Sequence, residues 1–326
     1  MILLMWDKKP YLEWMVKIFG TGLFLWLILR STNLQEIILL LRNISLWGYM
    51  FLFLLFLFKQ FLTTVRWKIL LSFKGILAPI KSLYLSVLYG QSLNQVLPSR
   101  IGGDSARVAY LFTQYPKKKA AALSATFLDR LLGLIALIFL AFIDIPFVQG
   151  FYPGQKTVGV ILLGILVILI LLTLWGKLDW MFTWSMKLKW FPETIRNRIK
   201  NVWDILVEYR GNRRVLFRGL ILSLMSQGVM IIGQYLTFHL IGVQVSLIDL
   251  FLVIPVVTLI VTLPISIGGI GVREVTLVSL LAIQNNEVVS FSLIRYSFYI
   301  LLPVILALES IVEFVKNAWC DWKNVT

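Results

Sequence analysis

Cysteine and histidine are almost absent from this 326-residue chain, which holds one of each. The single Cys320 excludes a disulfide framework and a cysteine-based metal site, and the single His239 excludes a histidine-cluster metal centre. Charged residues are scarce too, at 14% against about 25% in a soluble domain, while 59% of the residues are hydrophobic. These figures exclude an ordinary soluble domain, a disordered chain and a fibrous one. They predict an all-α polytopic membrane protein with no metal and no cofactor.

The sequence also lacks the phosphate-binding motif of a nucleotide-driven motor, because no G-x-x-x-x-G-K-[ST] segment occurs. The net charge of +15 could indicate nucleic acid, but the basic residues lie between apolar runs. In a membrane protein that pattern is typical of orientation and of contact with anionic lipid headgroups. We therefore expect no nucleic-acid partner. The largest polar interruption, 176–214, is basic and amphipathic and is expected to lie along the membrane surface.

Apolar runs long enough to cross a membrane, about 20 residues each, occur six times along the chain. Two further apolar runs each end in a proline and a glycine pair, followed by charged residues. These two runs, 82–97 and 249–265, are not predicted to be simple spans. The six predicted full spans are 14–30, 46–62, 120–143, 158–175, 217–241 and 291–315.

The distribution of basic residues predicts the topology. If the segment 82–116 crossed the membrane, the long basic loops after it would lie outside, against the positive-inside rule. If it enters and leaves on the cytoplasmic side, the inner loops and tails carry 20 Lys and Arg residues and the outer loops carry three: Arg30, Arg42 and Lys156. We therefore predict a re-entrant hairpin at 82–116, in a cytoplasmic-membrane protein with both termini in the cytoplasm.

An internal repeat supports a second hairpin. Residues 97–107 and 263–273 both fit L-P-x-x-I-G-G-x-x-x-R, 166 positions apart. The match predicts a hairpin at 249–284 that enters from outside, within a single transmembrane domain built from inverted repeats at about 1–145 and 156–326. Proline disfavours helix at the residue before it and glycine permits unusual backbone angles, so these positions predict chain breaks, with half-helices beginning at Asp104 and near Gly271. The hairpin prolines and glycines are Pro98, Gly102, Gly103, Pro264, Gly268, Gly269 and Gly271.

Charged residues near these breaks are candidate ligands for a lipid headgroup. The N-termini of half-helices favour a phosphate, and a charge inside a membrane segment usually faces a cavity or a partner. The repeat offset places Asp129 opposite Arg295, and Glu274 is the expected counter-charge of the second hairpin. We expect Asp129 and Arg273 to serve function rather than folding; a structural ion pair is the alternative. The candidates are Arg100, Asp104, Arg107, Asp129, Arg130, Arg273, Glu274 and Arg295.

Polar stripes on the predicted helices are candidates for the lining of the same site. Interhelical hydrogen bonds are the alternative role for such side chains in a membrane. The candidates are Gln91, Asn94, Gln95, Gln227 and Gln234.

Three segments together resemble the transmembrane domain of the lysylphosphatidylglycerol synthase/flippase family. They are 94–107, with N-Q-V-L-P-x-x-I-G-G-D-x-x-R, then 127–134, with F-L-D-R-L-L-G-L, and 263–274. The pair Arg66-Trp67 fits as well, and the resemblance covers essentially the whole chain. It implies a flippase-like integral domain that handles a lipid with a charged or glycosylated headgroup. The aminoacyl transferase domain of fused bacterial members is not expected here, which argues against lysyl transfer.

The function predicted from the sequence is translocation of a phospholipid or lipid-linked headgroup between the two hairpins, with the phosphate held by Arg107, Arg130 and Arg273. One alternative is a membrane-embedded transferase for aminoacyl- or glycosyl-lipids, and another is a non-catalytic partner of a separate synthase. The expected partners are membrane lipids: an anionic or aminoacylated phospholipid or a polyprenyl-linked glycolipid. A homo-oligomer and a separate lipid-modifying enzyme stay open as further partners.

Overall fold

The computed structural model of the chain describes residues 19–96, 100–144, 204–262 and 266–302, except for single positions at 20, 25, 29, 31, 206, 210 and 267. Every regular element within these ranges is a helix. The all-α prediction is therefore confirmed for this part of the chain. The predicted span 158–175 lies outside the described residues, and the spans 14–30 and 291–315 lie partly outside them.

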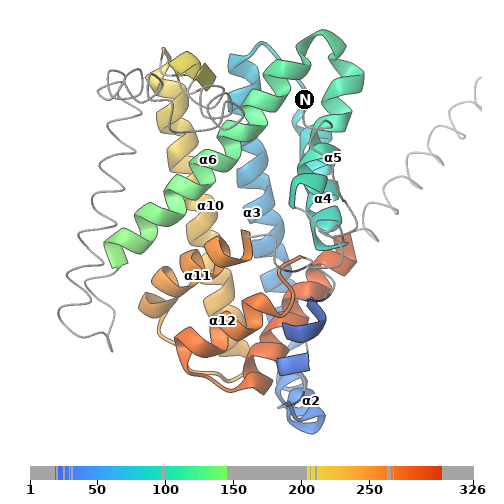
Figure 1. The fold of residues 1–326 in the computed structure, drawn as a ribbon, viewed down its shortest axis with the longest axis vertical. Coiled ribbons are helices and arrows are strands. Elements are labelled where there is room, and N and C mark those ends of the chain that lie inside the picture. The colour runs from blue at the N-terminus through green and yellow to red at the C-terminus, as the bar shows by residue number, and fades with distance from the viewer. Residues whose placement is uncertain are drawn as a thin grey trace, which may run out of the picture.

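The helices follow one another along the chain without long described loops (Figure 1). A further helix occupies 285–302, where the described residues end. The labelled helices are α2 (Leu34–Arg42), α3 (Leu46–Phe73), α4 (Ile80–Val96), α5 (Arg100–Gln114), the short 3-10 helix η2 (Pro116–Lys118), α6 (Lys119–Asp144), α10 (Arg213–Leu240), α11 (Leu247–Thr262) and α12 (Val272–Leu281).

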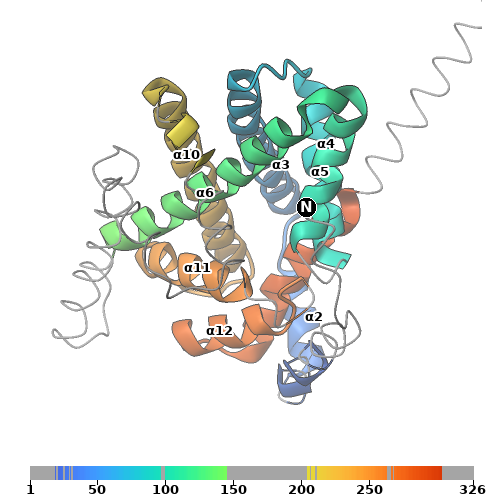
Figure 2. The same ribbon diagram turned by 45° about the horizontal axis from the view of Figure 1, so that its top comes forward.

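Three helical stretches among the described residues are long and apolar enough to cross a membrane: α3, the stretch from η2 through α6, and α10. At 1.5 Å per residue, the 28 residues of α3 or α10 extend about 42 Å, against a hydrocarbon core of about 30 Å. Both helices begin at a side-chain cap, where Ser45 accepts from the Gly48 amide and Asn212 accepts from the Val215 amide. In Figures 1 and 2, α6 crosses obliquely over α3 and α10, and all three pack against one another.

The helix that contains the second predicted span is longer than that span. The predicted span ends at residue 62, which would put the following Arg66 and Lys68 among the basic residues of a cytoplasmic loop, but α3 continues as a helix to Phe73. Charged positions in a sequence predict the end of an apolar span, whereas the Arg66 side chain is buried inside the protein and paired there. A charge satisfied by another helix does not end a membrane segment.

The first predicted hairpin consists of α4 and α5, which lie side by side in both views (Figures 1 and 2). Its second half-helix begins earlier than predicted, at Arg100 rather than Asp104, so Gly102 and Gly103 lie inside α5. Their role is therefore not to shape a turn. A Cβ at Gly103 would lie 2.1 Å from the Gly90 carbonyl oxygen of α4, so the glycine permits close packing of the two helices. Pro98 lies outside the described residues.

The second predicted hairpin consists of α11 and α12, which also pack together. Here the glycines do shape the break, because Gly268, Gly269 and Gly271 all have positive φ. Gly271 is the N-cap of α12, which confirms the predicted start of that half-helix. Pro264 lies outside the described residues.

Each helical hairpin packs into its own hydrophobic cluster. The first cluster joins α3, α4, α5 and α6 around Trp67, Leu83, Leu111 and Leu128, all fully buried. The second joins α3, α10, α11, α12 and the helix 285–302, and in it the rings of Phe238 and Phe291 stack with centroids 4.2 Å apart. The space between the two hairpins is thus flanked by two separate cores, and polar side chains gather there.

Candidate functional site

A cavity of about 440 Å³ lies between the two hairpins. Its wall comes from α3, α4, α5, α6, α10, α11, α12 and the helix 285–302, so residues far apart in the sequence share it. Two acidic and six basic residues line it. They are Asp104 and Asp129, and Lys59, Arg66, Arg107, Arg130, Arg273 and Arg295.

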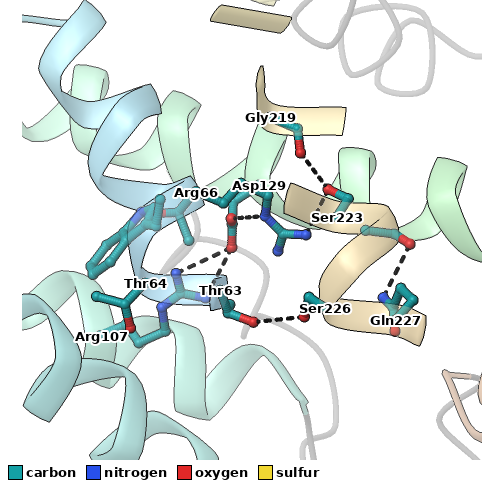
Figure 3. Close-up of polar contacts among 12 residues, drawn as sticks. Thr63, Thr64, Arg66, Arg107, Asp129, Gly219, Ser223, Ser226 and Gln227 are labelled. Atoms are coloured by element: carbon teal, nitrogen blue, oxygen red, sulfur yellow. Dashed lines mark hydrogen bonds and ion pairs between the residues drawn. The ribbon is translucent and has the colours of Figure 1, made fainter. Parts of the chain in front are cut away.

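Asp129 of α6 is the centre of the charge network in the cavity wall (Figure 3). Its Oδ1 accepts from Arg66 Nε at 2.6 Å, and its Oδ2 accepts from both terminal nitrogens of Arg107 at 3.2 Å. The three side chains are buried, with Asp129 only 1% exposed. One carboxylate therefore holds an arginine of α3 and an arginine of the first hairpin, which fixes the hairpin to the long helices.

Neutral groups complete the shell around these arginines. Arg66 Nη1 donates to Ser223 Oγ of α10 at 2.8 Å, and Ser223 in turn donates to the Gly219 carbonyl (Figure 3). The Arg107 guanidinium lies 4.2 Å from the ring centroid of Trp67, a cation–π contact. The indole Nε1 of Trp67 donates to Thr126 Oγ1 at 3.0 Å. The pair Arg66-Trp67, which fits the family resemblance in the sequence, is thus part of the buried site.

Asp104 of α5 forms a second, more open ion pair. It bonds with Arg130 of α6 and lies 3.9 Å from Arg107. The side chains of Asp104 and Arg130 are 18% and 39% exposed, so this pair is much less buried than the Asp129 network. All four predicted ligands of the first half described here, Asp104, Arg107, Asp129 and Arg130, therefore meet at one end of the cavity.

Glu274 caps the second half-helix rather than pairing directly with Arg273. Its Oε2 accepts from the Gly271 amide at 2.6 Å, and its Oε1 accepts from the hydroxyls of Ser292 and Tyr296 at 2.6 and 3.0 Å. Arg273 reaches it only through Tyr296, whose hydroxyl accepts from Arg273 Nη1 at 3.0 Å. The Gly271 amide is thus already engaged at the α12 N-terminus, and Glu274 does not line the cavity.

Arg295 and Lys59 complete the charged wall on the side of the second half. Arg295 Nη2 donates to the Tyr299 hydroxyl at 3.3 Å, one helical turn further on. Lys59 projects from α3 into the same cavity, as do Tyr299 and Arg273. The cavity thus joins Asp129 and Arg295, the two positions that the repeat offset predicted to match.

Most predicted site residues line the cavity. The structure describes Gln95, Arg100 and Gly102 only as backbone positions of α4 and α5. Gly269 does not line it, but a Cβ there would lie 2.2 Å from Val261. The predicted residues in the wall are Gln91, Asn94, Asp104, Arg107, Asp129, Arg130, Gln227, Gln234, Gly268, Arg273 and Arg295.

Some of the predicted polar lining has a packing role as well. Asn94 Oδ1 accepts from the Gly103 amide at 3.1 Å, which bridges α4 and α5. Gln227 Nε2 donates to the Gly133 carbonyl at 3.2 Å, which bridges α10 and α6. Both interpretations of the polar stripes therefore hold for these two residues, since each also faces the cavity.

Lys59, Tyr299 and the place of Arg66 in the site were not predicted from the sequence. Lys59 had a visible signal, because it follows thirteen uncharged residues from Leu46 to Phe58 inside a predicted span. A lysine at that depth usually faces a cavity or a partner. Tyr299 had no such signal, because tyrosine is common at membrane interfaces and its position there needs no site.

The match to known proteins covers nearly the whole chain. The family model described as "Lysylphosphatidylglycerol synthase TM region" matches residues 14–307. A UPF0104 membrane protein of Methanothermobacter thermautotrophicus is 23% identical over 278 residues, which are 79% of this chain and 77% of that protein. A UPF0104 membrane protein of Methanocaldococcus jannaschii is 29% identical over 131 residues, which are 40% of this chain and 38% of that protein.

No solved structure matches the chain significantly. The family match includes both glycine motifs, all eight charged residues of the cavity wall and the three membrane-capable helices. It therefore agrees with an integral membrane protein whose function concerns lipids, and the chain belongs to the lysylphosphatidylglycerol synthase TM region family.

Proposed function

We propose that the chain translocates a membrane lipid, whose charged headgroup passes through the cavity between the two hairpins. The observation that carries the proposal is the cavity itself, a space of about 440 Å³ with eight charged residues in its described wall, among helices long enough to cross a membrane. Eight charged residues in such a place are costly unless they bind one another or a ligand. The family match supports a lipid as that ligand.

The proposal includes re-entrant hairpins that enter from opposite sides of the cytoplasmic membrane. Supporting it, α4 with 17 residues and α11 with 16 are each shorter than the roughly 20 residues that a full crossing needs, and each is followed by a break and a second helix. A charged headgroup could then reach the middle of the membrane from either side without crossing a full apolar barrier. This is the arrangement that broken helices give in many transporters.

Accessibility labelling tests this topology. On a Cys320→Ser background, single cysteines replace the exposed residues Lys81 and Gln114 at the ends of the first hairpin, and Gln244 and Gln284 at the ends of the second. With a membrane-impermeant thiol reagent, we expect the first two to react only from the cytoplasmic side and the last two only from outside. Opposite sides within either pair would contradict a re-entrant hairpin there.

Blocking the cavity tests translocation. Leu134 lines the cavity and is 37% exposed, so Leu134→Trp should fill part of the space without removing a charge or a core contact. We expect at least about a tenfold loss of translocation rate in proteoliposomes, because a headgroup and an indole compete for the same volume. The assay follows fluorescent lipids of differing headgroup that become accessible to an impermeant quencher.

Ile232→Trp is the matched control, since Ile232 is 41% exposed and does not line the cavity. It should leave the rate within about twofold, because surface substitutions have small effects. Equal rates for the parent and Leu134→Trp, with both folded, would contradict passage through this cavity. If no lipid moves faster than in protein-free vesicles, the proposed function is wrong.

A further inference from the structure

Three of the cavity cations lie together without an ion-pair partner among the described residues. Lys59, Arg273 and Arg295 line the same cavity, and Arg295 is within electrostatic range of the other two. In the described residues, the ion pairs of the cavity-lining cations all involve Arg66, Arg107 or Arg130. Like charges repel strongly where water is scarce, so an anion placed among Lys59, Arg273 and Arg295 would be stabilised.

The nearest carboxylates are already engaged elsewhere. Both oxygens of Asp129 accept hydrogen bonds from Arg66 and Arg107. Both oxygens of Glu274 also accept, one from the Gly271 amide and one from the hydroxyls of Ser292 and Tyr296. The carboxylates of Asp129 and Glu274 therefore act on the three cations only at longer range, and the cluster keeps an excess of positive charge.

A hydrogen-bond donor lies beside the three cations. The Tyr299 hydroxyl accepts from Arg295 at 3.3 Å and lines the cavity. A hydroxyl both accepts and donates, and no acceptor for its hydrogen occurs among the described residues, so it can donate to an anion held by Arg295. Guanidinium groups suit phosphate oxygens in particular, because they donate in a planar, forked geometry.

We propose that Lys59, Arg273 and Arg295 bind a phosphate group that carries at least two negative charges, as in a lipid phosphomonoester or a lipid diphosphate. The inference rests on the proposed function and names the substrate class of the same cavity. A phosphomonoester carries about −1.5 to −2 at pH 7. A phosphodiester such as phosphatidylglycerol carries one negative charge and would leave most of the cluster uncompensated. A zwitterionic headgroup would add a cation to a cluster of cations.

Binding to the purified full chain in detergent tests the substrate class. The probes are phosphatidic acid, farnesyl diphosphate, phosphatidylglycerol and phosphatidylcholine, at one ionic strength and matched detergent. We expect phosphatidic acid or farnesyl diphosphate to bind at least about tenfold more tightly than phosphatidylglycerol, because a second charge contacts cations that are otherwise uncompensated. Binding of farnesyl diphosphate alone assigns a diphosphate; binding of phosphatidic acid alone or of both assigns a terminal phosphate.

Single-charge variants show whether the preference comes from this cluster. Lys59→Gln and Arg295→Gln should each reduce the preference to about threefold or less, while phosphatidylglycerol binding changes little. Neither change strands a carboxylate, so both variants should keep the thermal unfolding temperature of the parent. Lys68→Gln is the control, because Lys68 lies on the same helix as Lys59 but does not line the cavity.

Equal affinity for phosphatidylglycerol and the doubly charged lipids would overturn the inference, and so would a preference unchanged in both Lys59→Gln and Arg295→Gln. The outcome is separable from that of the proposed function. A charge preference in binding without translocation of any lipid would overturn translocation and keep the phosphate site. Translocation without such a preference would overturn the phosphate site and keep the proposed function.

Discussion

Asp129→Asn should destabilise the protein by about 3–5 kcal/mol, which is the usual effect of removing one partner of a buried ion pair. The reason is that one carboxylate, 1% exposed, pairs with both Arg66 and Arg107. An amide of the same shape keeps the volume, but it leaves the buried Arg66 without its counter-charge and leaves Arg107 with only Asp104, 3.9 Å away. The measurement is the free energy of unfolding from a denaturing-detergent titration in mixed micelles.

Asp104→Asn is the matched control, because it removes a carboxylate from the same cavity but from a more exposed pair with Arg130. Asp104→Asn should lower the free energy of unfolding by about 1 kcal/mol or less, as is typical of partly solvated ion pairs. The double variant Asp129→Asn/Arg66→Gln should recover part of the loss, since it removes one stranded cation. An Asp129→Asn protein as stable as the parent would contradict this role for the carboxylate.

The sequence analysis assigned Asp129 and Arg273 to function rather than folding, and the geometry separates the two residues. Asp129 is bonded on both oxygens to arginines of other helices, whereas the Arg273 side chain, within the described part of the chain, donates hydrogen bonds to the Tyr296 hydroxyl and the Gly268 carbonyl and to no carboxylate. Loss of Arg273 strands no carboxylate, because Glu274 keeps its other donors. A folding role is therefore expected for Asp129, and the functional role stays a prediction for both.

The helical architecture could be predicted because long apolar runs and repeated glycine motifs are local signals. The motif at 263–273 correctly located the start of α12, where three glycines have positive φ. The same letters at 97–107 suggested a turn, but Gly102 and Gly103 lie within α5. A glycine needed for backbone conformation and a glycine needed for close packing look alike in a sequence, since only the neighbouring helix distinguishes them.

The cavity could be predicted only in part, because its described members come from eight helices. Charges beside the motifs, such as Arg107 and Arg273, were found from their position in the sequence. The pairing of Arg66 with Asp129 joins residues 63 positions apart and depends on how α3 packs against α6. Such a contact has no local pattern, which is why Arg66 was assigned to a loop.

Gly103→Ala should destabilise the first hairpin strongly, by about 3 kcal/mol, because the added methyl group has no space. A Cβ at this position would lie 2.1 Å from the Gly90 carbonyl oxygen and 2.4 Å from the Asn94 side chain. The Gly90 oxygen belongs to the backbone of α4 and cannot move by a rotamer change, so the two helices must separate. The separation would also break the bond between the Gly103 amide and Asn94.

Gly228→Ala gives the control, since a Cβ at Gly228 in α10 would meet nothing within 4 Å. There the exchange should stabilise the protein slightly, by about 0.5–1 kcal/mol, through the higher helix propensity of alanine. The same propensity gain applies inside α5, so a net loss at Gly103 isolates the packing effect. For Gly103→Ala, the free energy of unfolding and the translocation rate should both fall, because α4 and α5 supply Gln91, Asn94, Asp104 and Arg107 to the cavity wall. A Gly103→Ala protein as stable as Gly228→Ala would show that α4 and α5 do not pack closely enough at Gly90 and Gly103 to exclude a methyl group.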